Sequence, residues 1–134
     1  MRNGYTMAKP EGLKAIASHL RGADESERDR LRRLIKVGLH RDVDVTDMPV
    51  EKRHQVSQVY CSAVPVAYNR IEPEHWEPLA RLVLEAAYEA TLLAALADSS
   101  KGKSRRVLLT GLGGGAFGNS QAWITDAIDF ALAQ

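Results

Sequence analysis

Apolar residues recur at three- and four-residue spacing, the pattern of an amphipathic helix, in four stretches of the chain. The longest stretch, from Trp76 to Ala97, carries a broad apolar face rich in alanine, which predicts close packing against a sheet. Pro10 suits the first turn of the first helix, and Gly22 can end it. The predicted helices span residues 10–20, about 24–36, about 76–97 and about 121–133.

Three shorter stretches have the patterns of β-strands. Residues 37–45 alternate apolar and polar side chains, which predicts an edge strand with one polar face. Residues 56–64 form a more continuous apolar run that ends at Pro65, and residues 105–110 form a leucine-rich run typical of a buried strand. Because a helix connects the last two strands, we expect them to be parallel. The predicted fold class is therefore α/β, a small mixed sheet with flanking helices.

The 134 residues are enough for a single domain. We expect a helical N-terminal part with an edge strand over residues 1–54, followed by a β-α-β-α core over residues 55–134. The predicted sheet is small for the helices beside it, and the chain stops after a helix, where an α/β sheet would usually gain another strand. We therefore expect either missing elements or completion by another chain.

The composition is that of an ordinary globular protein, and a formal net charge of +1 gives no reason to expect nucleic acid or a membrane as a partner. The arginine-rich run at residues 28–33 alternates with acidic residues, so we predict a solvated face, with a phosphate-binding patch as the alternative. The single cysteine, Cys61, favours a cytoplasmic protein. The four histidines form no recognisable dyad with Cys61 and no metal-binding pair, so we expect an inert thiol, no metal site and no cofactor.

Five of the ten glycines lie between Gly111 and Gly118, directly after the predicted strand at 105–110 and before the last predicted helix. Such a loop lets backbone N–H groups and the helix dipole face an anion. The dinucleotide-binding pattern fails because no second strand with a carboxylate follows, and the P-loop pattern fails because Asn119 replaces its lysine. The remaining interpretation is an anion cradle of backbone amides covered by Phe117. The alternative is a turn that lets strand and helix pack closely.

The segment Gly-Gly-Gly-Ala-Phe-Gly-Asn at residues 113–119 resembles the diphosphate-binding loop of macro domains, especially the branch related to bacterial poly(ADP-ribose) glycohydrolases. Those proteins carry a Gly-Ala-Phe-Gly loop at the same strand-to-helix junction. The chain is more similar still to a set of uncharacterised, macro-like bacterial proteins, and this resemblance covers nearly all of it. The matching stretches are Asn3–Tyr5, Val56–Tyr68, Leu84–Thr91 and residues 113–124.

This resemblance implies a ligand and an architecture. Longer relatives have a substantial region before the position of Met1 and a further strand after the position of Gln134, so the chain looks like the C-terminal half of a macro-like protein. The adenine-recognising aspartate and the catalytic asparagine of macro domains match no stretch here. The resemblance implies that the diphosphate of ADP-ribose or a related nucleotide lies on the loop, with Phe117 against the ribose. The implied contacts are Gly113, Gly114, Gly115, Ala116, Phe117, Gly118 and Asn119.

Three functions remain open at this point. The first is a module that binds an ADP-ribose-like nucleotide. The second is an ADP-ribosyl hydrolase half-site that needs another chain; within this chain only Glu85 or Glu89, which share a helix face, could serve as its carboxylate. For these two residues the preferred interpretation is a solvated or interface face. The third is a non-catalytic assembly element, whose exposed sheet edge pairs with a partner or with a copy of itself. The expected protein partners are a second copy in a homo-oligomer or a missing N-terminal half.

Overall fold

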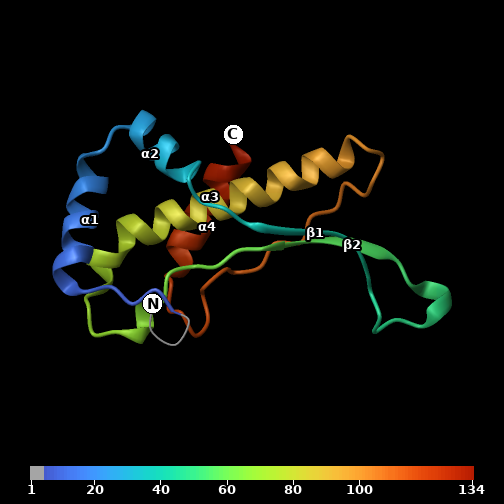
Figure 1. The fold of residues 1–134 in the computed structure, drawn as a ribbon, viewed down its shortest axis with the longest axis horizontal. Helices are drawn as coiled ribbons and strands as arrows, with labels where there is room; N and C mark the ends of the chain where they lie inside the picture. The colour runs from blue at the N-terminus through green and yellow to red at the C-terminus, as the bar shows by residue number, and fades with distance from the viewer. Residues whose placement is uncertain (1–4) are drawn as a thin grey trace.

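A computed structural model describes residues 5–134, so Asn3 and Gly4, which belong to one of the resembling stretches, lie outside it. The described chain is a mixed α/β structure (Figure 1). Its helices are α1 (Pro10–Gly22), α2 (Glu25–Arg32), α3 (Pro73–Ser99) and α4 (Gln121–Leu132), its strands are β1 (Gly38–Asp44) and β2 (Gln55–Tyr60), and its short 3-10 helices are η1 (Val50–Lys52) and η2 (Val66–Tyr68).

Within residues 5–134 the sheet consists of β1 and β2, paired antiparallel with Leu39 opposite Val59 and Val43 opposite Val56. The pairing is interrupted between His40 and Val43, and within the interruption Asp42 adopts a φ of 57°. The expected parallel pair and mixed sheet are therefore wrong for residues 5–134. The predicted strand at 105–110 is outside the sheet, because within these residues it has no neighbouring strand with which to form a ladder.

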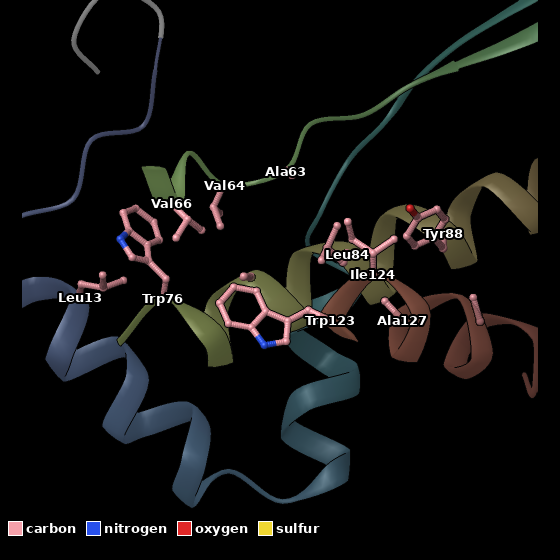
Figure 2. Close-up of a cluster of buried hydrophobic side chains, with 12 residues drawn as sticks. Leu13, Ala63, Val64, Val66, Trp76, Leu84, Tyr88, Trp123, Ile124 and Ala127 are labelled. Carbon is pink, nitrogen blue, oxygen red and sulfur yellow. The ribbon is translucent and has the colours of Figure 1, made fainter. Parts of the chain in front are cut away.

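Helix α3 organises the fold, and α4, α1 and α2 all contact it. Its alanines serve this packing, since Ala80 and Ala87 are almost completely buried and Ala127 of α4 is buried with them. The expectation that the alanine face packs against a sheet is corrected accordingly: the main packing partners of α3 are helices, whose axes small side chains allow to approach closely, and only its last part, around Ala94 and Ala95, lies beside β2. Figure 2 shows Trp76, Trp123 and other large side chains of this core between the helices and the segment that follows β2.

Some arginines of the arginine-rich segment at α2 are exposed to solvent, whereas one is buried against the core. Arg30 and Arg33 are exposed and pair with acidic residues one turn away, as a solvated face predicts. Arg32, in contrast, is only 4% exposed, and its guanidinium lies over the ring of Phe130 in α4. The predicted solvated face is therefore correct for half of these positions and wrong for Arg32, which fastens α2 to the core.

The hairpin formed by β1 and β2 is joined to the far end of α3 through one carboxylate. Asp98 accepts hydrogen bonds from Ser57 of β2 and from Nε of Arg41 in β1, the latter at 2.9 Å. These bonds, Ser57 first, hold the pKa of the Asp98 carboxyl below its usual range. Asp98 therefore fixes the hairpin alongside α3, in the arrangement that Figure 1 shows.

Candidate functional site

The glycine loop joins residue 110 to helix α4, and two of its glycines have the left-handed backbone that other residues rarely adopt. Gly113 has a φ of +73°, and a Cβ atom there would lie 2.3 Å from the Cβ of Ala63. Gly118 has a φ of +71°, and its Cβ would lie 2.8 Å from that of Ala67. Glycine at both positions is required by the turn and by the close approach of the segment after β2.

The other three glycines are not equivalent. A Cβ at Gly114 would meet Cδ1 of Ile124 at 3.0 Å, so this position is also tight. Gly111 and Gly115 have no positive φ, and a Cβ at either would have no heavy atom within 4 Å beyond its chain neighbours. The fold therefore does not explain why glycine stands at Gly111 and Gly115.

The backbone of the loop leaves a row of donors without partners. The loop is closed by hydrogen bonds from the N–H of Gly118 to the carbonyl of Gly115 (3.0 Å) and from the N–H of Asn119 to the carbonyl of Gly113 (2.9 Å). Within residues 5–134, the consecutive N–H groups of Gly115, Ala116 and Phe117 donate no hydrogen bond. The exposed backbone around Gly115 can therefore bind an anion directly before the N-terminus of α4.

Asn119 lies beneath the loop and is 4% exposed. Its Nδ2 donates to the carbonyl of Val64 at 2.9 Å and to that of Gly113 at 3.2 Å, which ties the loop to the segment after β2. Its buried Oδ1 has no hydrogen-bond partner among the described residues. The neighbouring Ser120 caps α4 by accepting from the N–H of Ala122. The buried side chain of Asn119 therefore holds the loop in place.

Phe117 belongs to an aromatic cluster that sequence reasoning missed. Its ring meets those of Tyr68 and Tyr5 edge to face, with centroids 5.3 and 5.9 Å apart, and the two tyrosine rings are 4.8 Å apart. The carbonyl of Phe117 also accepts a hydrogen bond from the N–H of Ala67 at 2.9 Å. The cluster fixes the side of the loop that faces η2. Tyr5, Tyr68 and Phe117 are far apart in the sequence, so no local pattern could have grouped them.

A buried tyrosine of α3 positions the segment that leads into the loop. The hydroxyl of Tyr88 donates to the carbonyl of Thr110 at 2.7 Å and accepts from the N–H of Leu112 at 3.0 Å. Burial raises the pKa of Tyr88, so the hydroxyl stays protonated and able to donate at neutral pH.

Tyr88→Phe should lower the free energy of unfolding by about 1–3 kcal/mol, because it removes the buried donor to the carbonyl of Thr110 and one of the two acceptors of the Leu112 N–H, which keeps only its bond to Thr110 at 2.8 Å. Urea unfolding measures the loss, and amide exchange at Leu112 should speed up. The matched control is Tyr60→Phe, since Tyr60 is 57% exposed and should tolerate the change. Equal stability of the two variants would contradict this role for Tyr88.

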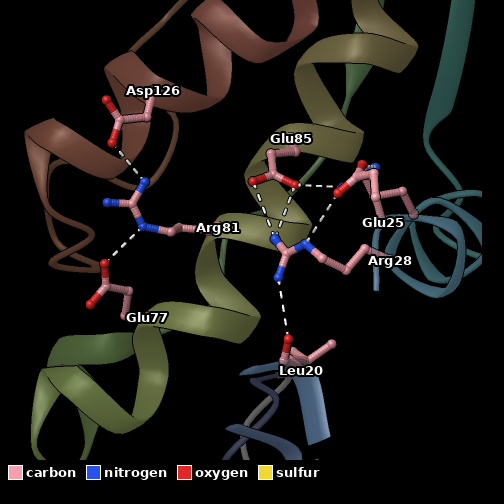
Figure 3. Close-up of polar contacts among 8 residues, drawn as sticks. Leu20, Glu25, Arg28, Glu77, Arg81, Glu85 and Asp126 are labelled. Carbon is pink, nitrogen blue, oxygen red and sulfur yellow. Dashed lines mark hydrogen bonds and ion pairs between the residues drawn. The ribbon is translucent and has the colours of Figure 1, made fainter. Parts of the chain in front are cut away.

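The two candidate carboxylates on α3 have different surroundings. Glu85 is held by Arg32 at 2.9 Å and by Arg28 at 3.5 Å, both from α2, in a half-buried cluster of charges. Figure 3 shows the contact between Glu85 and Arg28. Arg28 continues to the carbonyl of Leu20 at the end of α1. Glu89 is half-buried and makes no ion pair within residues 5–134. The carboxylate of Glu85 is thus occupied in joining α3 to α2. Glu85 and Glu89 share no partner in the described part of the chain and do not form a common site.

The single cysteine and the metal-binding side chains add no second site. Cys61 is half-buried, and burial raises the pKa of its thiol, which lowers its reactivity at neutral pH. Among residues 5–134, no group of three or more histidine, cysteine, aspartate or glutamate side chains is placed to hold a metal ion. In the same part of the chain, no helix combines the length and the apolar character needed to span a bilayer.

The loop at residues 111–119 is therefore the candidate site that both the sequence and the geometry single out. Comparison with known proteins adds no name to it: no family model matches the chain, and neither a curated protein nor a solved structure is significantly similar to it.

Proposed function

We propose that this chain is a macro-like module that binds the diphosphate of ADP-ribose or a related nucleotide through the loop Gly111–Asn119. The observation that carries the proposal is Gly115, which the fold does not require as glycine and which begins the row of N–H groups without partners. A glycine in open space lets a bulky anion approach the backbone, and the N-terminus of α4 adds a favourable dipole.

Binding is favoured over hydrolysis by the surroundings of the candidate carboxylates. An acid–base catalyst must reach the reacting atoms, whereas Glu85 faces two arginines from α2. The macro-like fold and a cytoplasmic location belong to the same proposal, the first from the resembling stretches and the second from the single cysteine. Under this proposal the chain supplies the diphosphate part of a site.

Gly115→Glu should weaken ADP-ribose binding more than tenfold, because its carboxylate would repel the diphosphate at close range. Titration calorimetry with the intact chain measures the affinity of wild type and variant. The matched control is Gly12→Glu, which makes the same charge change on α1 at a position that is also open, and it should bind like wild type. Thermal unfolding should show that Gly115→Glu remains folded.

Two outcomes contradict the proposal. Wild type that gives no heat with ADP-ribose at millimolar concentration would exclude binding by this chain. Equal loss of affinity in Gly115→Glu and Gly12→Glu would show that net charge, and not the loop, determines binding.

A further inference from the structure

A groove of about 730 Å³ separates β2 from the extended segment that precedes the glycine loop. Its walls are β2, including Val56 and Val59, with Cys61 just after the strand, and residues 106–110, and its floor is the last part of α3, including Thr91 and Ala95. In Figure 1 the chain after α3 returns beneath that helix and runs in the same direction as β2. The groove therefore lies between two extended segments of the same polarity.

The wall formed by residues 106–110 has the hydrogen-bonding groups of a strand without a ladder. Within residues 5–134, the N–H groups of Val107, Leu108, Leu109 and Thr110 donate to no acceptor, and the carbonyls of residues 105–109 accept from no donor. The neighbouring groups that are bonded have local or side-chain partners: the N–H of Arg106 donates to Ser104, and the carbonyl of Thr110 accepts from Tyr88 and from the N–H of Leu112. A row of extended backbone groups of this kind is a template for pairing with another strand.

Both faces of this segment are apolar as well. Leu109 packs against the main core, whereas Leu108 is 84% exposed and Val107 is 36% exposed. Strands that read as continuous apolar runs are usually central strands, covered on both faces and paired on both edges. The opposite wall can also pair with an added strand. One edge of β2 is bonded to β1, and its other edge has no strand in the described part of the chain.

The charges at one end of the groove indicate which segment fits there. Lys103 pairs with Asp42 and Arg41 with Asp98, but Arg105 and Arg106 make no ion pair within residues 5–134. This end therefore carries an uncompensated positive charge. A second copy of the chain is a poor partner, because the segment that it could insert begins with the same two arginines.

We propose that the groove binds an extended segment of a separate polypeptide, which becomes the central strand between β2 and residues 105–110. The segment is mainly apolar and carries a carboxylate at the end that lies beside Arg105 and Arg106. Its backbone pairs with β2 on one edge and with residues 105–110 on the other, and its side chains alternate between α3 and the outer face.

The proposal can be tested with displayed random peptides of about eight residues, long enough for an average strand. The intact chain selects them, and the tightest peptide is synthesised and its affinity measured by fluorescence anisotropy. We expect apolar peptides with an aspartate or glutamate at one end. Successive N–H groups of a central strand bond to opposite neighbours, so N-methylation at either of two successive central residues should weaken binding about tenfold or more.

Charge reversal locates the peptide on the chain. Arg106→Glu should lower the affinity of the chain for the acidic peptide about tenfold. The variant should instead bind more tightly to a peptide in which lysine replaces the acidic residue. Arg70→Glu, a matched change at an exposed position outside the groove, should leave both affinities unchanged. The proposal is overturned if no peptide is enriched, if only alternate N-methylations matter, if Arg106→Glu behaves like Arg70→Glu, or if ADP-ribose displaces the peptide competitively.

Discussion

Gly113→Ala should lower the free energy of unfolding by about 2–5 kcal/mol, the largest loss expected from adding a methyl group at any of the described glycines. Two effects add. Alanine must adopt the left-handed backbone of Gly113, where φ is +73°, and its methyl group would stand 2.3 Å from the Cβ of Ala63. The collision involves a Cβ close to the backbone, so neither partner can rotate away. Equilibrium urea unfolding measures the difference from wild type.

Gly111→Ala is the matched control, because it adds the same methyl group to the same loop at an open position without positive φ. Its stability should stay within about 1 kcal/mol of wild type, with a gain possible through reduced freedom of the unfolded chain. If both variants lose the same stability, the close contact with Ala63 is not the reason for glycine at position 113.

Glu85→Gln should lower the free energy of unfolding by about 2–4 kcal/mol. The change removes the negative charge of a half-buried carboxylate that compensates the positive charges of Arg28 and Arg32. Arg32 is the more sensitive partner, since its side chain is 3% exposed and its Nη1 lies 2.9 Å from Glu85. Glu25 still pairs with Arg32, so the loss is smaller than for an isolated buried ion pair. Urea unfolding measures the effect, and α2 should show the earliest amide exchange.

The exposed pair Asp29 and Arg33, which lies within α2 and its C-cap, provides the control for Glu85. Asp29→Asn removes a carboxylate at a comparable distance from its arginine but in solvent, so it should change stability by less than about 1 kcal/mol. An equally small loss for Glu85→Gln would mean that Arg28 and Arg32 find enough water to replace their partner, and would reopen Glu85 for a role in chemistry.

The helices were predictable because their signals are local. The spacing of apolar residues and Pro10 placed α1 within two residues of its observed end, and Pro73 begins α3 a few residues before the predicted start at Trp76. A strand is different, because its apolar run is local but its ladder is not. The predicted buried strand at residues 105–110 is wrong for the described chain: the segment has no strand partner and is mostly exposed, which no pattern within it could reveal.

The candidate site was likewise predictable only where its signals are local in the sequence. The cluster of glycines located the loop, but only the fold distinguishes Gly113 and Gly118, which packing requires, from Gly115, which it does not. The spacing of Glu85 and Glu89 correctly placed both on α3, yet the partners of Glu85 are 53 and 57 residues away in the sequence. Long-range contacts of this kind decide whether a carboxylate is catalytic or structural.

Tyr88 connects the proposed strand-binding groove with the proposed nucleotide-binding loop. It lines the groove and also holds the backbone at Thr110 and Leu112, the entrance to the glycine loop. A strand that orders residues 105–110 therefore removes part of the conformational entropy that a loop ligand would otherwise have to overcome. Because coupling between two sites is reciprocal, a nucleotide on the loop would favour the strand by the same factor. Under the two proposals above, Tyr88 would therefore make strand binding in the groove and nucleotide binding on the loop parts of a single equilibrium.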